Sequence, residues 1–289
     1  MNEIDLRKTL ESSNDKLSVF ADSSLLTKYK GLTVSSLFGL VDDFLNDSQK
    51  AALFEFEHFK NINQQLRILI AMSISDNNIK LELLQKPNGI LSDLQSYQIS
   101  DFLESLDSSY RLKLFQDPAS LKNLKLNKYS MQAVVCSLSD SDVINLLEDI
   151  DYVKEQLNLD DFLISGIISN ISSEKDKLDL LSNIFLDSYC KASALVTVSD
   201  SAKAEILLSN EYNLNSYELC KILSSMDTEF LINYFNEHVD FFEDNNITLR
   251  SVVEDLSYKN QLSFVAQIDK VNLDERQEKT NLSYFTSRS

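Results

Sequence analysis

An aromatic side chain recurs at one position in five consecutive segments of the chain. Tyr97, Tyr129, Phe162, Tyr189 and Tyr217 each stand nine residues before an apolar residue that precedes a polar turn. Tyrosine is favoured at the energetic centres of protein interfaces, because its ring is large and apolar and its hydroxyl group is polar. These five residues, the aromatic column, are therefore predicted to contact a partner. The structural alternative is that the rings pack between neighbouring segments, with the hydroxyl groups at the rim.

Carboxylates are concentrated between positions 140 and 161, where Lys154 is the single basic residue. This acidic run favours a protein partner with a basic surface, although a solvated face with helix-capping aspartates is the structural alternative. The acidic run consists of Asp140, Asp142, Glu148, Asp149, Asp151, Glu155, Asp160 and Asp161. A basic group precedes it and is expected to pair with the acidic segment that follows. That group consists of Arg111, Lys113, Lys122, Lys125 and Lys128.

The residues needed for catalysis are scarce. His58 and His238 are the only histidines, and 180 residues separate them, so we do not expect them to share a metal. Adjacent carboxylates such as Asp160 and Asp161 point in different directions on a helix and do not form an acid/base pair. The chain has four glycines and neither a GxSxG nor an HExxH motif. We expect no enzymatic activity, no catalytic residue, no metal site and no cofactor.

The charge balance restricts the class of partner. Acidic residues outnumber basic ones by 45 to 27, which gives a net charge of -18. This charge repels nucleic-acid phosphates and anionic lipids, so we expect neither as a partner. No stretch approaches the roughly 18 apolar residues of a membrane span, and the N-terminal segment lacks the apolar core of a signal peptide, so we expect a cytoplasmic protein. Cys136, Cys190 and Cys220 have no metal-ligand spacing and are expected to be reduced and buried.

A polar turn recurs at intervals of 27–33 residues. The apolar residue before each turn is termed the turn anchor: Leu45, Ile74, Leu106, Leu138, Ile171, Val198, Met226 and Leu256. The next residue is always Asn, Asp or Ser, whose side chains cap helices. These predicted caps are Asn46, Ser75, Asp107, Ser139, Ser172, Ser199, Asp227 and Ser257.

Apolar residues also flank each turn anchor at fixed distances. Four residues before it stand Val41, Ile70, Phe102, Val134, Ile167, Ala194, Ile222 and Val252. Nine residues after it stand Phe54, Leu83, Phe115, Leu147, Leu180, Leu207, Phe235 and Val265. This spacing predicts that each repeat consists of a helix A, a capped turn and a shorter helix B.

The repeats predict an all-α fold, a right-handed α-solenoid of about eight irregular helical hairpins. A single hairpin cannot offset its backbone entropy with one apolar stripe, so the hairpins must stack. Residues 31–271 form the predicted solenoid, residues 1–30 a helical cap and residues 272–289 a polar flexible tail. The cap prediction depends on Ile4, Leu10, Leu17, Phe20, Leu25 and Leu26. The chain resembles the α-solenoid class as a whole, over roughly residues 31–270, without the signatures of tetratricopeptide or ankyrin repeats.

The C-terminal segment carries a second resemblance. Asp274, Glu275 and Glu278 are followed by Leu282, Phe285 and a finish rich in Ser and Thr. This pattern resembles the C-terminal export signals of effectors delivered by the Legionella-type type IV secretion system. The resemblance implies delivery into a host cell.

Three classes of function remain open on these observations. The favoured class is a non-enzymatic binding protein that holds, and inhibits or regulates, one protein partner. The first alternative is an acidic mimic of nucleic acid that blocks a nuclease or a DNA-binding protein, which requires carboxylates along one continuous edge. The second alternative is an enzyme with an unrecognised site, which requires a deep pocket with ionisable groups of perturbed pKa.

Overall fold

The described part of the chain is built from α-helices. The computed structural model describes residues 2–28, 31–60, 62–86, 94–256, 260, 261 and 264, and these residues form no β-strand. The all-α prediction is confirmed. The tail over residues 272–289, the cap Ser257 and the apolar Val265 lie outside the described residues. No helix in the described ranges combines the length and the apolar character of a membrane span.

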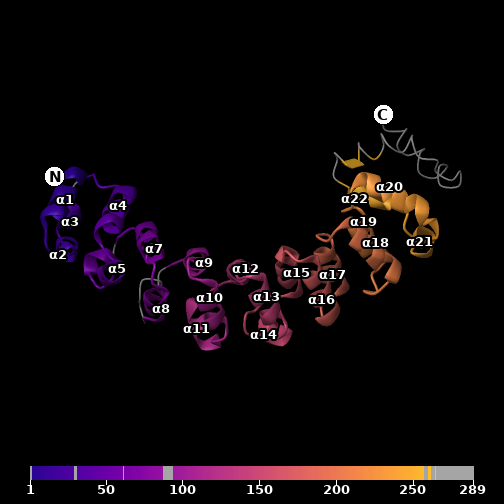
Figure 1. Cartoon of the computed structure of the whole chain (residues 1–289), viewed down its shortest axis with the longest axis horizontal. Coiled ribbons are helices and arrows are strands. Elements are labelled where there is room, and N and C mark those ends of the chain that lie inside the picture. The colour runs from indigo at the N-terminus through magenta and orange to yellow at the C-terminus, as the bar shows by residue number, and fades with distance from the viewer. Residues whose placement is uncertain are drawn as a thin grey trace. The chain divides into compact units, whose positions relative to one another are not determined.

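Contacts divide the chain into two units. The first holds the chain up to Val143 together with Glu155–Asn158, and the second holds Ile144–Lys154 and the chain from Leu159 onward. The A helices of the first unit are α4 (Val34–Phe44), α7 (Gln64–Met72), α9 (Ser96–Glu104) and α12 (Lys128–Cys136). Those of the second unit are α15 (Asp161–Asn170), α17 (Ser188–Leu195), α19 (Ser216–Leu223) and α22 (Leu249–Asp255). Within each unit every A helix contacts the next A helix along the chain (Figure 1).

A helix B follows each turn that the structure describes completely. These helices are α5 (Asp47–Leu53), α8 (Asn77–Gln85), α10 (Ser108–Phe115), α13 (Asp140–Leu147), α16 (Glu174–Asn183), α18 (Asp200–Ser209) and α20 (Thr228–Glu237). Helix B is not always the shorter one, because α18 has ten residues and α17 has eight. Four repeats add a short third helix: α6 (Glu57–Lys60), α11 (Pro118–Leu124), α14 (Ile150–Glu155) and α21 (Val239–Asp244). These repeats therefore contain three helices rather than the predicted two.

The apolar columns of the sequence form the core of the repeats. All eight turn anchors are buried, as are all eight residues that stand four positions before them. The seven described residues nine positions after the anchors are buried as well. Burial at three positions per repeat confirms the alignment of the repeats, because each position faces inward in every copy.

The predicted caps are correct at most turns and early by one residue at two. Asn46, Ser199 and Asp227 are N-caps whose side chains accept hydrogen bonds from backbone amides of the following helix. Ser139 accepts from the amide of Asp142, and Asp107 holds the N-cap position without such a bond. At the turns of Ser75 and Ser172, helix B begins one residue later. Asp76 and Ser173 are the N-caps there.

The N-terminal region repeats the same arrangement. Helix α1 (Glu3–Ser12) contacts α4, and α2 (Lys16–Ala21) contacts α5 and the short α3 (Leu25–Lys28). Leu10, Phe20 and Leu25 are buried as expected, whereas Ile4 is exposed and Leu6 is buried instead. The apolar face of α1 is therefore rotated relative to the predicted one, since Leu6 and Leu10 are one helical turn apart.

Five basic side chains are buried at the fourth residue of a helix B. These buried cations are Lys50, Lys80, Arg111, Lys177 and Lys203. Each donates a hydrogen bond to the residue directly before the next turn anchor, as Lys80 Nζ does to the Ser105 carbonyl at 2.7 Å and Lys203 Nζ to the Ser225 carbonyl at 3.1 Å. A cation at the C-terminal end of a helix is favourable because unpaired carbonyl oxygens and the negative end of the helix dipole lie there. The buried cations thus join consecutive repeats.

A second set of hydrogen bonds joins the turns. The first residue of a helix B accepts from a backbone amide of the next turn, as Asp47 Oδ2 does from Ser75 at 2.9 Å and Asp200 Oδ2 does from Asp227 at 2.9 Å. Asn77, Ser108 and Glu174 make equivalent bonds in their repeats. These bonds satisfy amides that the turns leave free of intrahelical partners.

Candidate functional site

The aromatic column lies at one structural position on five consecutive A helices. Each member is the second residue of its helix, in α9, α12, α15, α17 and α19. The exposed fractions are 62% for Tyr97, 64% for Tyr129, 61% for Phe162, 40% for Tyr189 and 62% for Tyr217. Four of the five rings are thus mainly solvent-exposed rather than packed between repeats. Exposed aromatic residues at a repeated position are typical of interaction surfaces.

In the second unit the column includes a stacked pair. The ring centres of Tyr189 and Tyr217 are 6.3 Å apart and their planes differ by 11°. The Lys221 Nζ atom lies 4.0 Å from the centre of the Tyr189 ring and donates to Ser193 Oγ at 2.6 Å. The pair and its lysine therefore form a defined arrangement in which an aromatic face binds an ammonium group. Lys221 was not among the residues predicted from the sequence, although it stands four residues after Tyr217 on the same face of α19.

In the first unit the column contributes Tyr97 and Tyr129, which are carried by the contacting helices α9 and α12. The Lys128 Nζ atom lies 5.3 Å from the centre of the Tyr129 ring. Ser96 Oγ, next to Tyr97, accepts from the backbone amide of Asn127 at 2.8 Å. This hydrogen bond between the N-terminal ends of α9 and α12 thus fixes the relative position of the two helices and of the rings that they carry.

Several carboxylates of the acidic run serve the fold. Asp142 accepts hydrogen bonds from Ser108 and Ser139, both at 2.7 Å, and these bonds lower the pKa of Asp142 below its ordinary value. Asp149 accepts from the amide of Tyr152, and Asp160 is the N-cap of α15. Asp161 forms an ion pair with Lys154 at 2.7 Å. These aspartates are therefore committed to local contacts.

The other members of the acidic run differ in exposure. Glu148, Asp151 and Glu155 are exposed, and Asp140 is half-buried in the first turn of α13. The run is divided between the two units, because Asp142 and Glu155 belong to the first and Glu148, Asp149 and Asp151 to the second. The exposed members remain candidates for contact with a basic partner.

Arg111 of the basic group attracts Asp142 of the acidic run electrostatically, but its hydrogen bonds go to backbone groups. This side chain is buried and donates to the carbonyl oxygens of Glu104 and Leu106 at 2.7 and 2.6 Å, and also to that of Ser137. Burial lowers the pKa of Arg111 below its ordinary value, although nearby carboxylates partly oppose this shift. Lys113 lies over the ring of Tyr110, with its Nζ 4.8 Å from the ring centre. Arg111 is therefore a structural residue that acts on the ends of two A helices.

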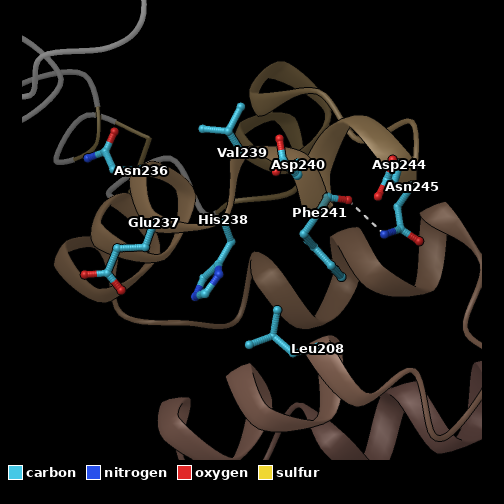
Figure 2. A pocket seen from close by; sticks show the side chains of 9 residues that line it. All are labelled: Leu208, Asn236, Glu237, His238, Val239, Asp240, Phe241, Asp244 and Asn245. Atoms are coloured by element: carbon cyan, nitrogen blue, oxygen red, sulfur yellow. Dashed lines mark hydrogen bonds between the residues drawn. The ribbon is translucent and has the colours of Figure 1, made fainter.

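A cavity of about 460 Å³ lies near the end of the second unit. It is lined by Leu208, Asn236, Glu237, His238, Val239, Asp240, Phe241, Asp244 and Asn245. Figure 2 shows His238, Phe241 and Leu208 turned toward one another, whereas Glu237, Asp240 and Asp244 point in different directions. Carboxylates that diverge in this way cannot share a proton or a metal ion. The cavity therefore offers an apolar floor with an acidic rim and no convergent acid/base pair.

Thiol reactivity and metal binding depend on how the cysteines are buried and on how His, Cys, Asp and Glu side chains are grouped. Cys190 and Cys220 are buried, whereas Cys136 is half-buried rather than fully buried as expected, and these three cysteines form no disulfide. Burial raises the pKa of the Cys190 thiol to about 12. A thiol with so high a pKa is a poor nucleophile at neutral pH. Over the described ranges, no three His, Cys, Asp or Glu side chains are grouped so that they could hold a metal ion.

Comparisons with known proteins give no relative for the chain. No protein-family model matches it, and neither the curated proteins nor the solved structures contain a match.

Proposed function

We propose that the chain is a non-enzymatic, right-handed α-solenoid that binds one protein partner with a basic surface and thereby inhibits or regulates it. The exposure of the aromatic column carries this proposal. A folded chain buries most of its large apolar side chains, yet here five consecutive repeats present one at the same helical position. The serial contacts between A helices within each unit support a solenoid, in which such positions form an extended surface.

Charge supports the choice of a basic partner. The net charge of the chain is -18, and Glu148, Asp151 and Glu155 are exposed within the acidic run. Long-range attraction accelerates association with an oppositely charged protein, and salt screens this attraction over roughly 8 to 10 Å. The nucleic-acid mimic receives less support, because several aspartates of the run cap helices or form local pairs. The enzyme alternative also receives less support than the binding protein, because the carboxylates that line the cavity point in different directions.

The test compares capture by the parent chain with capture by column variants. One variant carries Tyr97→Ala and Tyr129→Ala, a second carries Tyr189→Ala and Tyr217→Ala, and Phe185→Ala is the control. Phe185 is exposed but lies outside the column. A protein captured by the parent and the control should be lost with at least one column variant, in direct binding measurements on the purified pair. Equal affinity for all four chains would exclude the column as the binding surface.

Delivery into a host cell belongs to the same proposal but depends on a different segment. The acidic and apolar residues between positions 274 and 285 resemble an export signal, and they lie outside the described residues. A translocation reporter fused to the N-terminus of the full chain would measure delivery. Removal of residues 272–289 should abolish delivery and leave binding to the partner intact.

A further inference from the structure

The cavity of the second unit is built around the added helix α21. Its lining runs from the end of α20 through α21 to Asn245, and Leu208 of α18 completes it. The volume of about 460 Å³ falls in the range of about 300 to 1,000 Å³ that is typical of ligand sites. The aromatic column is carried by other helices and contributes no residue to this lining. The cavity is therefore a separate candidate for contact with a partner.

Buried aromatic side chains hold the walls of the cavity in place. The ring of Tyr234 contacts the rings of His238 and Phe241, with centres 4.6 and 6.0 Å apart. Phe242 is fully buried, and its ring centre lies 5.5 Å from that of Phe241. Asn245 Nδ2 donates to the carbonyl oxygen of Phe241 at 2.8 Å (Figure 2). These contacts preorganise the cavity, which reduces the conformational cost of binding.

The floor of the cavity leaves apolar surface in contact with solvent. Leu208 is 51% exposed, and Figure 2 shows its side chain directed toward His238 and Phe241. Both of these residues, and Val239 beside them, are half-buried. Removal of apolar surface from water is favourable in proportion to its area. The floor therefore favours a ligand that brings an apolar side chain.

The rim of the cavity carries negative charge that the chain does not neutralise. Glu237, Asp240 and Asp244 are exposed, and within the described ranges none of them forms an ion pair. The nine described lining residues include no lysine or arginine. In Figure 2, Glu237 lies to the left of His238 and Asp244 lies to the right of Phe241. Carboxylates on two sides of an apolar floor favour a ligand whose cations flank its apolar side chain.

We infer that this cavity binds a segment of the protein partner in which an apolar side chain stands between arginine or lysine residues. The inference rests on the proposed function, because it takes the partner to be a basic protein, and it adds a site distinct from the aromatic column. The apolar side chain packs against Leu208 and Phe241, and the cations lie near the rim carboxylates. Carboxylates that point in different directions suit cations spread along a peptide better than a single ion.

The first experiment measures the chemistry that the site selects. The probe is a fluorescent, amidated heptapeptide in which arginine and leucine alternate. Serine replaces leucine in one analogue, and citrulline replaces arginine in the other. The full chain should bind the probe at low salt and each analogue at least about five-fold more weakly. A serine analogue that binds as tightly as the probe would overturn the inference, because charge alone would then explain binding.

Histidine labelling shows where the probe binds. The chain has two histidines: His238 lines the cavity, and His58 belongs to the first unit. In the full chain with ¹³C-labelled histidine, the probe should shift the ring signals of His238 and leave those of His58 in place. His238→Gln assigns the two sets of signals. Unshifted His238 signals in the presence of saturating probe would overturn the inference, since the peptide would then bind elsewhere.

One pair of variants tests the apolar floor. Leu208→Gln removes the exposed leucine, and Ile4→Gln is the control, because Ile4 is an aliphatic residue of α1 that is 63% exposed. Leu208→Gln should weaken binding of the probe about three- to ten-fold, and the control should bind it like the parent. Circular dichroism checks that both variants keep the helical fold. Equal affinity of the two variants would mean that the floor does not contact the peptide.

A second pair of variants tests the rim at constant net charge. The rim variant combines Glu237→Gln, Asp240→Asn and Asp244→Asn. The control variant combines Glu205→Gln, Glu229→Gln and Glu243→Gln, which are exposed residues of the second unit outside the cavity lining. The rim variant should bind the probe about five-fold or more weakly at low salt, and the control should lose about two-fold or less. Equal losses would show that the general acidity of the chain, and not the rim, attracts the peptide.

The natural partner distinguishes this inference from the proposed function. Suppose Tyr189→Ala with Tyr217→Ala abolishes binding of the partner, while Leu208→Gln and the rim variant bind it like the parent. The aromatic column is then the binding surface, and the inference about the cavity is wrong. If the cavity variants lose the partner while the column variants bind it like the parent, the cavity is the site and the column is not. Loss with both sets would show that the partner uses both surfaces.

Discussion

The ammonium group of Lys80 donates a hydrogen bond to the carbonyl oxygen of Ser105, at 2.7 Å, from one repeat to the next. Lys80 is buried, and burial lowers its pKa below the ordinary value because the charged form loses its hydration. The Ser105 carbonyl lies at the C-terminal end of α9, where no following helical turn supplies an amide donor. A side chain that is costly to bury thus satisfies a backbone group that is costly to leave unpaired.

Replacement of Arg111 should reveal how much these contacts contribute. Arg111→Met keeps the bulk of the side chain but leaves the carbonyl oxygens of Glu104, Leu106 and Ser137 without this donor. We expect the free energy of unfolding to fall by about 3 kcal/mol or more, since each unpaired buried group costs about 1 to 3 kcal/mol. Lys113→Met, at an exposed residue of the same helix, should change it by about 0.5 kcal/mol or less. Urea unfolding measures both, and similar values for the two variants would contradict a structural role for Arg111.

A turn anchor should matter more than the cap beside it. Leu138 is buried, so Leu138→Ala should lower the free energy of unfolding by about 2 to 5 kcal/mol. Ser139 accepts from the amide of Asp142, so Ser139→Ala should lower it by about 0.5 to 2 kcal/mol. Thermal and urea denaturation of the two variants provide the comparison. Negligible effects at both residues would show that the repeat alignment does not describe the core.

Removal of the Tyr234 hydroxyl should stabilise the chain. This hydroxyl is buried and has no hydrogen-bond partner among the described residues, and an unpaired buried polar group costs about 1 to 3 kcal/mol. Tyr234→Phe should therefore raise the free energy of unfolding at neutral pH by about 1 kcal/mol. A decrease in calorimetry would show that the hydroxyl has a partner, such as water.

The same substitution should change the response to alkali. Burial raises the pKa of Tyr234 from an ordinary value of 10.0 to about 12. The folded chain then holds a proton that the unfolded chain releases, so stability is lost between about pH 10 and pH 12. Tyr234→Phe should reduce this loss. Identical pH profiles for the parent and the variant would contradict the raised pKa.

Ionisation of Cys190 in the unfolded chain should cause a second loss of stability, which begins at a lower pH than the loss caused by Tyr234. Burial raises the pKa of its thiol from 9.0 to about 12, with hydrogen bonding to Asp187 as a smaller cause. Its contribution is fully present below pH 9 and falls as the pH rises toward 12, because only the unfolded thiol ionises in that window. The slope of unfolding free energy against pH between about 9 and 10 should be smaller in Cys190→Ala. The same pH series on Cys136→Ala is the control, and equal slopes for the two variants would argue against the assignment to Cys190.

The core of the repeats could be predicted from the sequence because it depends on local periodicity. Leu138, Val134 and Leu147 occupy positions that a single amphipathic pattern defines, and such patterns hold wherever one helix face is buried. The caps could be predicted to within one residue. Ser172 and Ser173 are both capping types, so composition alone could not decide which of them starts helix B.

The buried cations could not be recognised from helix periodicity. A lysine on a helix is normally assigned to the solvated face. Lys177 would be assigned in the same way from the sequence, but in the structure it is buried and donates a hydrogen bond to Thr197. A signal exists across repeats, because each cation at the fourth position of helix B is matched by Ser or Thr before the next turn anchor. The sequence also could not determine whether the rings of the aromatic column are exposed, since rings packed between repeats would show the same spacing. The exposure of each ring depends on its position in the tertiary structure.

The buried cations have a consequence for how such a chain can be lengthened or shortened. The donor stands on one repeat and the acceptor on the next. The repeat of α7 and α8 therefore carries one acceptor, Ser73, which accepts from Lys50, and one donor, Lys80, which donates to Ser105 in the following repeat. Excision or duplication of whole periods between turn anchors leaves each remaining donor opposite an acceptor of the same kind. Whole repeats can thus be added or removed without loss of these hydrogen bonds, so recombination within the gene can vary the number of repeats.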